Sequence, residues 1–152
     1  MAMNQPPTRR LQPTVNAGRL WAGGAAAAVV AALLAVVGIV IARGIFDVPV
    51  LAPEGDGVWG NASTWWYALW AAVAGLLATA LAHVLLLTTP QPRTFFGWII
   101  GLATVIAALW PFTSDAGLDA KLVTMLINLV IGIAIGSLVS AVARSAVVPE
   151  IR

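Results

Sequence analysis

Four long apolar segments, separated by short polar loops, constrain this chain more than any other feature. They cover about residues 20–42, 65–87, 95–112 and 122–143, and none has a charged residue in its interior. About 20 apolar residues in a helix that rises 1.5 Å per residue cross the ~30 Å hydrocarbon core of a bilayer. Short connections make neighbouring helices run in opposite directions. The sequence therefore predicts an all-α membrane protein, an antiparallel four-helix transmembrane bundle.

The composition of the chain agrees with this fold class. Of its 152 residues, 61% are apolar and 9% are charged, whereas a soluble domain has about 25% charged residues. The net charge of +2 is spread along the chain and is not the basic patch of a nucleic-acid-binding protein. There is no cysteine, which excludes disulfides, thiolate metal sites and cysteine nucleophiles.

The polar stretches divide the chain into one domain and two tails. Residues 1–18 are rich in Pro, Asn and Gln and are expected to form a disordered cytoplasmic tail. Residues 19–144 form the transmembrane domain, and residues 145–152 a second cytoplasmic tail. The first apolar segment exceeds the roughly 7–15 residues of a signal-peptide core, which predicts an uncleaved helix. Residues 44–63 contain two prolines and four glycines, which argues against regular structure there.

Basic residues predict the orientation of the bundle. Six of them fall on the side of the two termini, and two fall on the opposite side: Arg9, Arg10, Arg19, Arg93, Arg144 and Arg152 against Arg43 and Lys121. Because cytoplasmic loops are enriched in Lys and Arg, we expect a multi-pass protein of the cell membrane with both termini in the cytoplasm.

Aromatic residues gather near the predicted membrane boundaries. Trp65, Trp66, Tyr67, Trp70 and Trp110 lie near the outer one. Amphipathic rings prefer the headgroup level, so anchoring in the interface is the favoured interpretation. The alternative is an aromatic outer surface that binds a partner or a membrane lipid.

Two residues inside the predicted spans are candidate polar sites. His83, the only histidine, is about five residues from the cytoplasmic end of the second segment. A proton relay would need further acids or histidines in the membrane, so a structural histidine is favoured. Asn128 lies near the middle of the fourth segment, where its amide needs a partner. Contact between helices is favoured for Asn128, with a substrate or ion contact as the alternative.

The loop of residues 44–63 carries the candidate outer acids Asp47, Glu54 and Asp56. It lacks the ligand series of a calcium loop, so an ordinary solvated turn is favoured over a cation site. The chain has no phosphate-binding loop, no HExxH motif and no paired membrane carboxylates. We therefore expect no catalytic, cofactor-binding or metal-binding residues, no cofactor and no enzymatic activity.

Small residues recur at four-residue intervals in each apolar segment. Examples are Gly97-x-x-x-Gly101 and Gly132-x-x-x-Gly136-x-x-x-Ser140. This spacing places small side chains on one helix face, where backbones approach closely. Packing within the bundle is the favoured interpretation, and a homo-oligomer interface is the alternative.

The chain resembles a group of small, uncharacterised four-helix integral membrane proteins found mainly in high-GC Gram-positive bacteria, a domain of unknown function. The matching stretches are Arg43-Gly-x-Phe-Asp-Val-Pro-Val-Leu-Ala-Pro53, His83-Val-Leu-Leu-Leu-Thr-Thr-Pro-Gln-Pro92 with Phe95-Phe-Gly-Trp98, and Asn128-Leu-Val-Ile-Gly-Ile-Ala-Ile-Gly-Ser137. The resemblance spans roughly residues 20–143 and implies no catalytic residue. The helix count is similar to that of small multidrug exporters, but the acid that those carry in the first helix is absent.

These observations favour a non-enzymatic membrane protein that supports or modulates a partner. The expected partners are membrane lipid and either a second copy of the chain or another membrane protein. The alternative function is a small transporter or channel subunit that acts as an oligomer, with His83 and Asn128 lining the path.

Overall fold

The computed structural model describes the backbone of residues 12–54, 58–61 and 63–150, and the side chains of residues 14–52 and 63–148. Within these ranges the long elements are the helices α1 (Ala17–Gly44), α2 (Thr64–Thr88), α3 (Pro92–Leu109) and α4 (Leu118–Ala146), with a 3₁₀ turn, η1 (Trp110–Thr113), after α3. Each of the four helices, α3 taken together with η1, is long and apolar enough to cross a membrane. The prediction of four apolar helices of spanning length is therefore confirmed.

The helices extend two to four residues beyond most of the predicted ends, because hydropathy marks the hydrocarbon part and the polar caps lie outside it. The side chain of Asn16 accepts a hydrogen bond from Arg19 N at 2.9 Å and begins α1. Ser63 accepts from Trp66 N at 3.2 Å and begins α2, as expected for an N-cap. Pro92 is the first residue of α3, where its missing N–H costs nothing.

Two short β-ribbons were not expected. In the loop of residues 44–63, β2 (Leu51–Glu54) pairs antiparallel with β3 (Val58–Asn61), so the prediction that prolines and glycines exclude regular structure there was wrong. At the other end, β1 (Gln12–Val15) pairs antiparallel with β4 (Val147–Glu150). These two strands lie in segments expected to be tails. The β1–β4 pairing joins segments that are far apart in the sequence, and their proximity depends on where α1 begins and α4 ends. Residues 1–11 of the expected disordered tail lie outside the described part of the chain.

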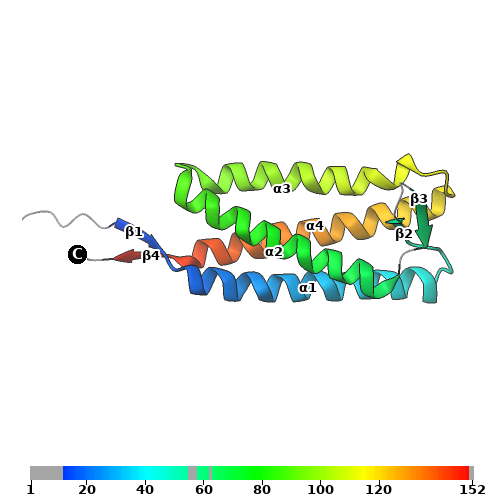
Figure 1. Cartoon of the computed structure of the whole chain (residues 1–152), viewed down its shortest axis with the longest axis horizontal. Helices are drawn as coiled ribbons and strands as arrows, with labels where there is room; N and C mark the ends of the chain where they lie inside the picture. The colour runs from blue at the N-terminus through cyan, green and yellow to red at the C-terminus, as the bar shows by residue number, and fades with distance from the viewer. Residues whose placement is uncertain (1–11, 55–57, 62, 151–152) are drawn as a thin grey trace, which may run out of the picture.

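The chain passes back and forth along the long axis of the molecule (Figure 1). The β1–β4 ribbon lies at one end, and the β2–β3 ribbon lies at the other. Helix α1 packs closely against α2 and α4, whereas α3 packs mainly against α4 and less against α2. Helix α3 also has the smallest buried share of the four. It is the peripheral helix, and its flanks are open.

The close contact of α1 with α2 depends on small residues. A Cβ atom added to Gly75 would lie 2.9 Å from Ala28 Cα, and one added to Gly24 would lie 2.3 Å from Thr79 Cγ2. Ala27, Ala31 and Ala35 of α1 are buried in the same core. Backbones that approach this closely gain dispersion contacts without large side chains. In these two helices, the small-residue spacing serves packing within the bundle.

Candidate functional site: two grooves beside α3

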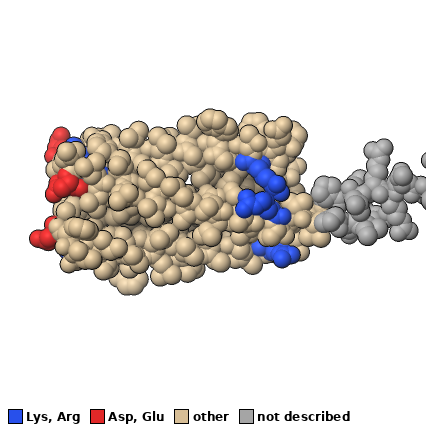
Figure 2. Space-filling view, turned by 180° about the vertical axis from the view of Figure 1, so that it is seen from behind, with Lys and Arg blue, Asp and Glu red and all other residues tan. Residues whose placement is uncertain are grey.

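The charges separate to the two ends of the molecule. Figure 2 shows most of the visible Lys and Arg atoms near the end where the termini emerge, Asp and Glu at the other end with a few basic atoms beside them, and an uncharged band between the two ends. Among the described residues, Arg19, Arg93 and Arg144 lie at the terminal end of the helices, while Asp47, Asp115 and Asp119 lie at the opposite end. We call the end that carries Asp47, Asp115 and Asp119 the outer end.

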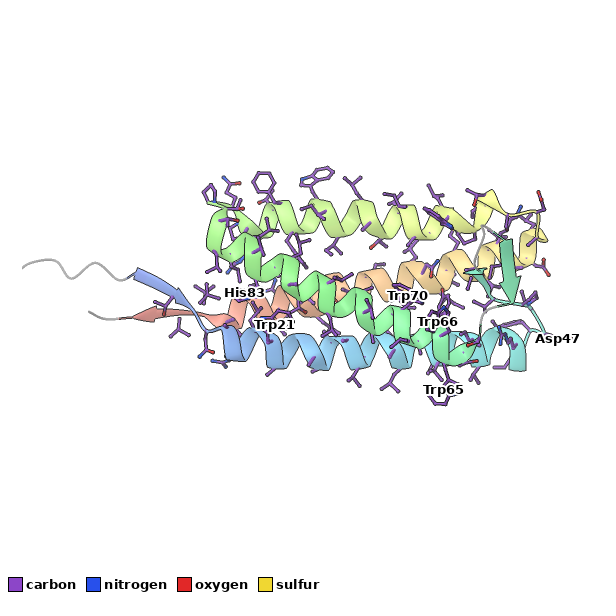
Figure 3. The ribbon with its side chains drawn as sticks, viewed as in Figure 1. Trp21, Asp47, Trp65, Trp66, Trp70 and His83 are labelled. Atoms are coloured by element: carbon purple, nitrogen blue, oxygen red, sulfur yellow. The ribbon has the colours of Figure 1, made fainter. Side chains whose placement is uncertain are left out.

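His83 makes its contact near the terminal end of the bundle. Trp21 of α1 donates a hydrogen bond from Nε1 to His83 Nδ1 at 3.1 Å. The two rings meet edge to face, with centroids 6.3 Å apart and an interplanar angle of 76°, and Figure 3 shows both side chains near the end of the helices closest to the termini. Since Nδ1 accepts, the neutral ring carries its hydrogen on Nε2. The histidine thus joins α2 to α1.

Asn128 joins three helices near the outer end. Its Nδ2 donates to the backbone oxygen of Ala107 in α3 at 2.7 Å, and its Oδ1 accepts from the Tyr67 hydroxyl of α2. In a continuous helix, the carbonyl of Ala107 would accept from the N–H of residue 111, but that residue is Pro111, which has no N–H. Asn128 supplies the donor that the proline removes.

The candidate residues lie apart. His83 lies nearer the terminal end of the bundle and Asn128 nearer the outer end, and they contact different partners. Asp47 is exposed at the outer end, with a positive φ of 52°. The side chain of Glu54 and the whole of Asp56 lie outside the described part of the structure. In the described part of the chain, no group of three or more His, Cys, Asp or Glu could hold a metal ion.

Thr124 is a polar contact that the sequence interpretation missed. Its buried hydroxyl donates to Ala120 O at 2.8 Å within α4 and accepts from Leu51 N of β2 at 3.0 Å. Val50, Leu51 and Ala52 are buried beside it. This contact holds the β2–β3 ribbon against the outer part of α4. The buried Val-Leu-Ala run in a loop otherwise rich in Gly and Pro was the available signal.

A wide groove opens between α2 and α3 and has α4 as its floor. Its volume is about 1200 Å³. Leu77 and Leu81 line it from α2, Ile99 and Ala103 from α3, and Ile135 from α4. The Tyr67–Asn128 pair and the ribbon residues Leu51 and Ala52 lie at its outer end. We call this the wide groove. The wide groove has a polar pair, Tyr67 and Asn128, at one end and is otherwise lined mostly by apolar residues.

A second groove runs on the other side of the contact between α3 and α4. Its volume is about 530 Å³, and Gly97, Gly101, Ser137 and Ser140 are among its lining residues. A Cβ atom added to Gly97 or Gly101 would meet nothing within 4 Å. We call this the narrow groove. The two grooves meet at the seam where Thr104 packs on Gly132.

Comparison with known proteins gave one match. A family model described as "Family of unknown function (DUF6069)" matches residues 15–146. No curated protein and no solved structure gave a significant match. The matched range includes all four helices and both grooves, and the family description assigns no activity to them.

Proposed function

The chain belongs to this family of unknown function, and from its geometry we propose that it is a multi-pass protein of the cell membrane that binds a partner within the bilayer and catalyses no reaction itself. Both termini lie in the cytoplasm in this proposal. The uncharged band between the two charged ends (Figure 2) supports insertion, because charged side chains are costly in hydrocarbon. The excess of Arg at the terminal end supports the orientation.

The narrow groove is the surface where we propose that the partner binds. Its α3 wall extends from Phe96 to Leu109, about 20 Å along the helix axis, which is most of the length of α3. Gly97 and Gly101 leave the backbone uncovered on this wall. In membranes, helices associate where small residues allow close backbone contact. The partner that fits is a transmembrane helix, either from a second copy of the chain or from another membrane protein.

The glycines of α3 differ in their surroundings from four glycines of the other helices. Gly24, Gly75, Gly132 and Gly136 each face a neighbouring residue of the same chain within 3.0 Å of an added Cβ. These four glycines therefore already allow close packing between helices of the same chain. Gly97 and Gly101 have no such neighbour, and their four-residue spacing therefore remains open to an external helix.

The alternative of a transporter or channel subunit is less well supported. A path would need polar side chains along its length. His83 lies nearer the terminal end and Asn128 nearer the outer end, and the wide groove between α2 and α3 is lined mostly by apolar residues. The described polar groups favour a protein that binds a partner over one that conducts an ion.

The experiment uses the absence of native cysteine. A single Ser137→Cys in the narrow groove should form a disulfide-linked dimer in oxidised membranes or, with a short bifunctional reagent, a crosslink to one discrete membrane protein. Val29→Cys, at an exposed position of α1, is the control and should give neither product.

A blocking variant completes the test. Gly101→Phe adds a ring to the narrow groove at a position where an added Cβ atom meets nothing within 4 Å, and it should abolish the product of Ser137→Cys. Ala26→Phe adds the same ring on an exposed face of α1 and should leave the product unchanged. If Ser137→Cys behaves like Val29→Cys, or if Gly101→Phe has no effect, the proposed interface is wrong.

A further inference from the structure

We propose that the wide groove binds one phospholipid of the outer leaflet, with an acyl chain between α2 and α3 and the phosphate beside Lys121. The proposal rests on the membrane insertion proposed above, but it uses a different surface from the narrow groove. The wide groove has an apolar body, a polar end and a cation beyond that end, and these are arranged in the order of the parts of a phospholipid.

The body of the groove fits a hydrocarbon chain. Its α2 wall covers the 16 residues from Trp66 to Leu81, about 22 Å along the helix axis. None of its lining residues is charged. Its volume of about 1200 Å³ exceeds the ~300–1,000 Å³ of typical ligand pockets. Within a bilayer such an apolar space is not filled by water, so a lipid chain is the available occupant.

The polar end of the groove lies toward the outer end of α3. Asn128 bonds Ala107, which is two residues before the end of α3. Only one of its two amide hydrogens has an acceptor among the described residues, so the second can donate to an ester or phosphate oxygen. The Tyr67 hydroxyl donates to Asn128 and retains an acceptor lone pair.

Tryptophans border the outer part of the groove. Trp66 and Trp70 of α2 meet edge to face with ring centroids 6.0 Å apart, and both line the groove together with Trp110 at the end of α3. Figure 3 shows Trp66 and Trp70 on successive turns of α2, toward the end that carries the β2–β3 ribbon. Indole rings favour the headgroup level, which places this end of the groove beside the lipid headgroups.

The charge near the groove fits a phosphate. Lys121 precedes Asn128 by seven residues, about two turns of α4, and therefore lies on the same face nearer the outer end. Asp119 precedes Asn128 by nine residues, which places this acid on the opposite face. The face of α4 that continues the groove thus carries a cation, and the acid of the first turn points away.

The test is native mass spectrometry of the full chain in mild detergent. The probe is palmitoyl-oleoyl-phosphatidylglycerol, added in steps, and the readout is the fraction of monomer that carries one lipid. Ala103 is an exposed residue of the groove wall, and Ala103→Phe should weaken binding at least about tenfold, which corresponds to ~1.4 kcal/mol. Ala74→Phe, which narrows the groove from the α2 wall, should do the same.

Matched controls separate this proposal from the others. Ala26→Phe on α1 and Gly101→Phe in the narrow groove should bind the lipid like the parent chain. Lys121→Gln should weaken binding of phosphatidylglycerol while leaving the circular dichroism spectrum unchanged. Because the readout is lipid on the monomer, loss of the dimer in Gly101→Phe does not affect it.

Three results would overturn the lipid proposal. The first is binding to Ala103→Phe and Ala74→Phe that equals binding to the parent. The second is equal weakening by Ala26→Phe, which would indicate adsorption to the general apolar surface. The third is loss of a dimer, and not of a lipid, in Ala103→Phe, which would assign the wide groove to a second copy of the chain. Failure of the narrow-groove crosslink alone would leave the lipid proposal standing.

Discussion

The side-chain amide of Asn128 donates a hydrogen bond to the backbone oxygen of Ala107 at 2.7 Å, at the position left without its helical donor by Pro111. The carbonyl is close to the end of α3, in a helix that makes few contacts with α2. One side chain of α4 therefore completes the hydrogen bonding of a neighbouring helix and fixes the outer end of α3 against the bundle.

This relationship predicts a thermodynamic coupling between Asn128 and Pro111. Asn128→Leu should lower the stability in detergent by about 1–2 kcal/mol, because it leaves the Ala107 carbonyl and the Tyr67 hydroxyl without their partner. In a Pro111→Ala background the restored N–H can bond Ala107, so Asn128→Leu should cost less. Thermal unfolding of the parent, both single variants and the double variant measures the difference. Simple additivity would mean that Asn128 does not compensate for the proline.

The contact between Trp21 and His83 predicts that the histidine acts in structure and not in proton transfer. His83→Gln keeps a hydrogen-bonding side chain and should resemble the parent in expression and in oligomeric state. Trp21→Phe removes the indole donor and should destabilise the α1–α2 contact by about 0.5–1.5 kcal/mol. The functional check is a proton-flux assay in proteoliposomes at pH values on both sides of neutrality. Proton flux in the parent that disappears in His83→Gln would favour the transporter alternative.

Thr124 is expected to control the position of the β2–β3 ribbon. Thr124→Val keeps the shape of the side chain but removes the oxygen that accepts from Leu51 N, so the buried amide loses its partner at a cost of about 1–3 kcal/mol. Hydrogen exchange of β2 should become faster, while exchange in α1 should not change. Thr88→Val is the matched control, because Thr88 is exposed and bonds only the backbone of its own helix and its neighbour Thr89 among the described residues. Unchanged exchange at Leu51 in Thr124→Val would show that other contacts hold the ribbon.

The proposed orientation predicts which ends of the helices are accessible from outside the cell. Asp47 at the outer end and Gln91 between α2 and α3 are both exposed, and the chain has no native cysteine. In intact cells, an impermeant thiol reagent should label Asp47→Cys but not Gln91→Cys. Both variants should react after the membrane is permeabilised, which controls for reactivity. The reverse pattern in intact cells would place the termini outside.

The apolar pattern of the chain is enough to predict the number, type and approximate limits of the long helices. Uninterrupted apolar runs of about 20 residues leave few alternatives, because a spanning helix satisfies its backbone hydrogen bonds internally. Residue types typical of helix ends also stand where α2 and α3 begin and where α3 ends, namely Ser63, Pro92 and Pro111. The Gly and Ala spacing predicted close contacts but could not decide whether they lie inside the bundle or on its surface.

The tertiary structure decided which residues meet, because partners far apart in the sequence are brought together only by the placement of the helices. It assigned Gly75 to contact with Ala28 and left Gly97 and Gly101 open. The fold also brings Asn128 to the carbonyl of Ala107, 21 residues away, and Leu51 to Thr124. The wide groove is open because α3 packs more closely against α4 than against α2. Hydropathy is a property of single segments, whereas a groove is a property of the angles and contacts between them.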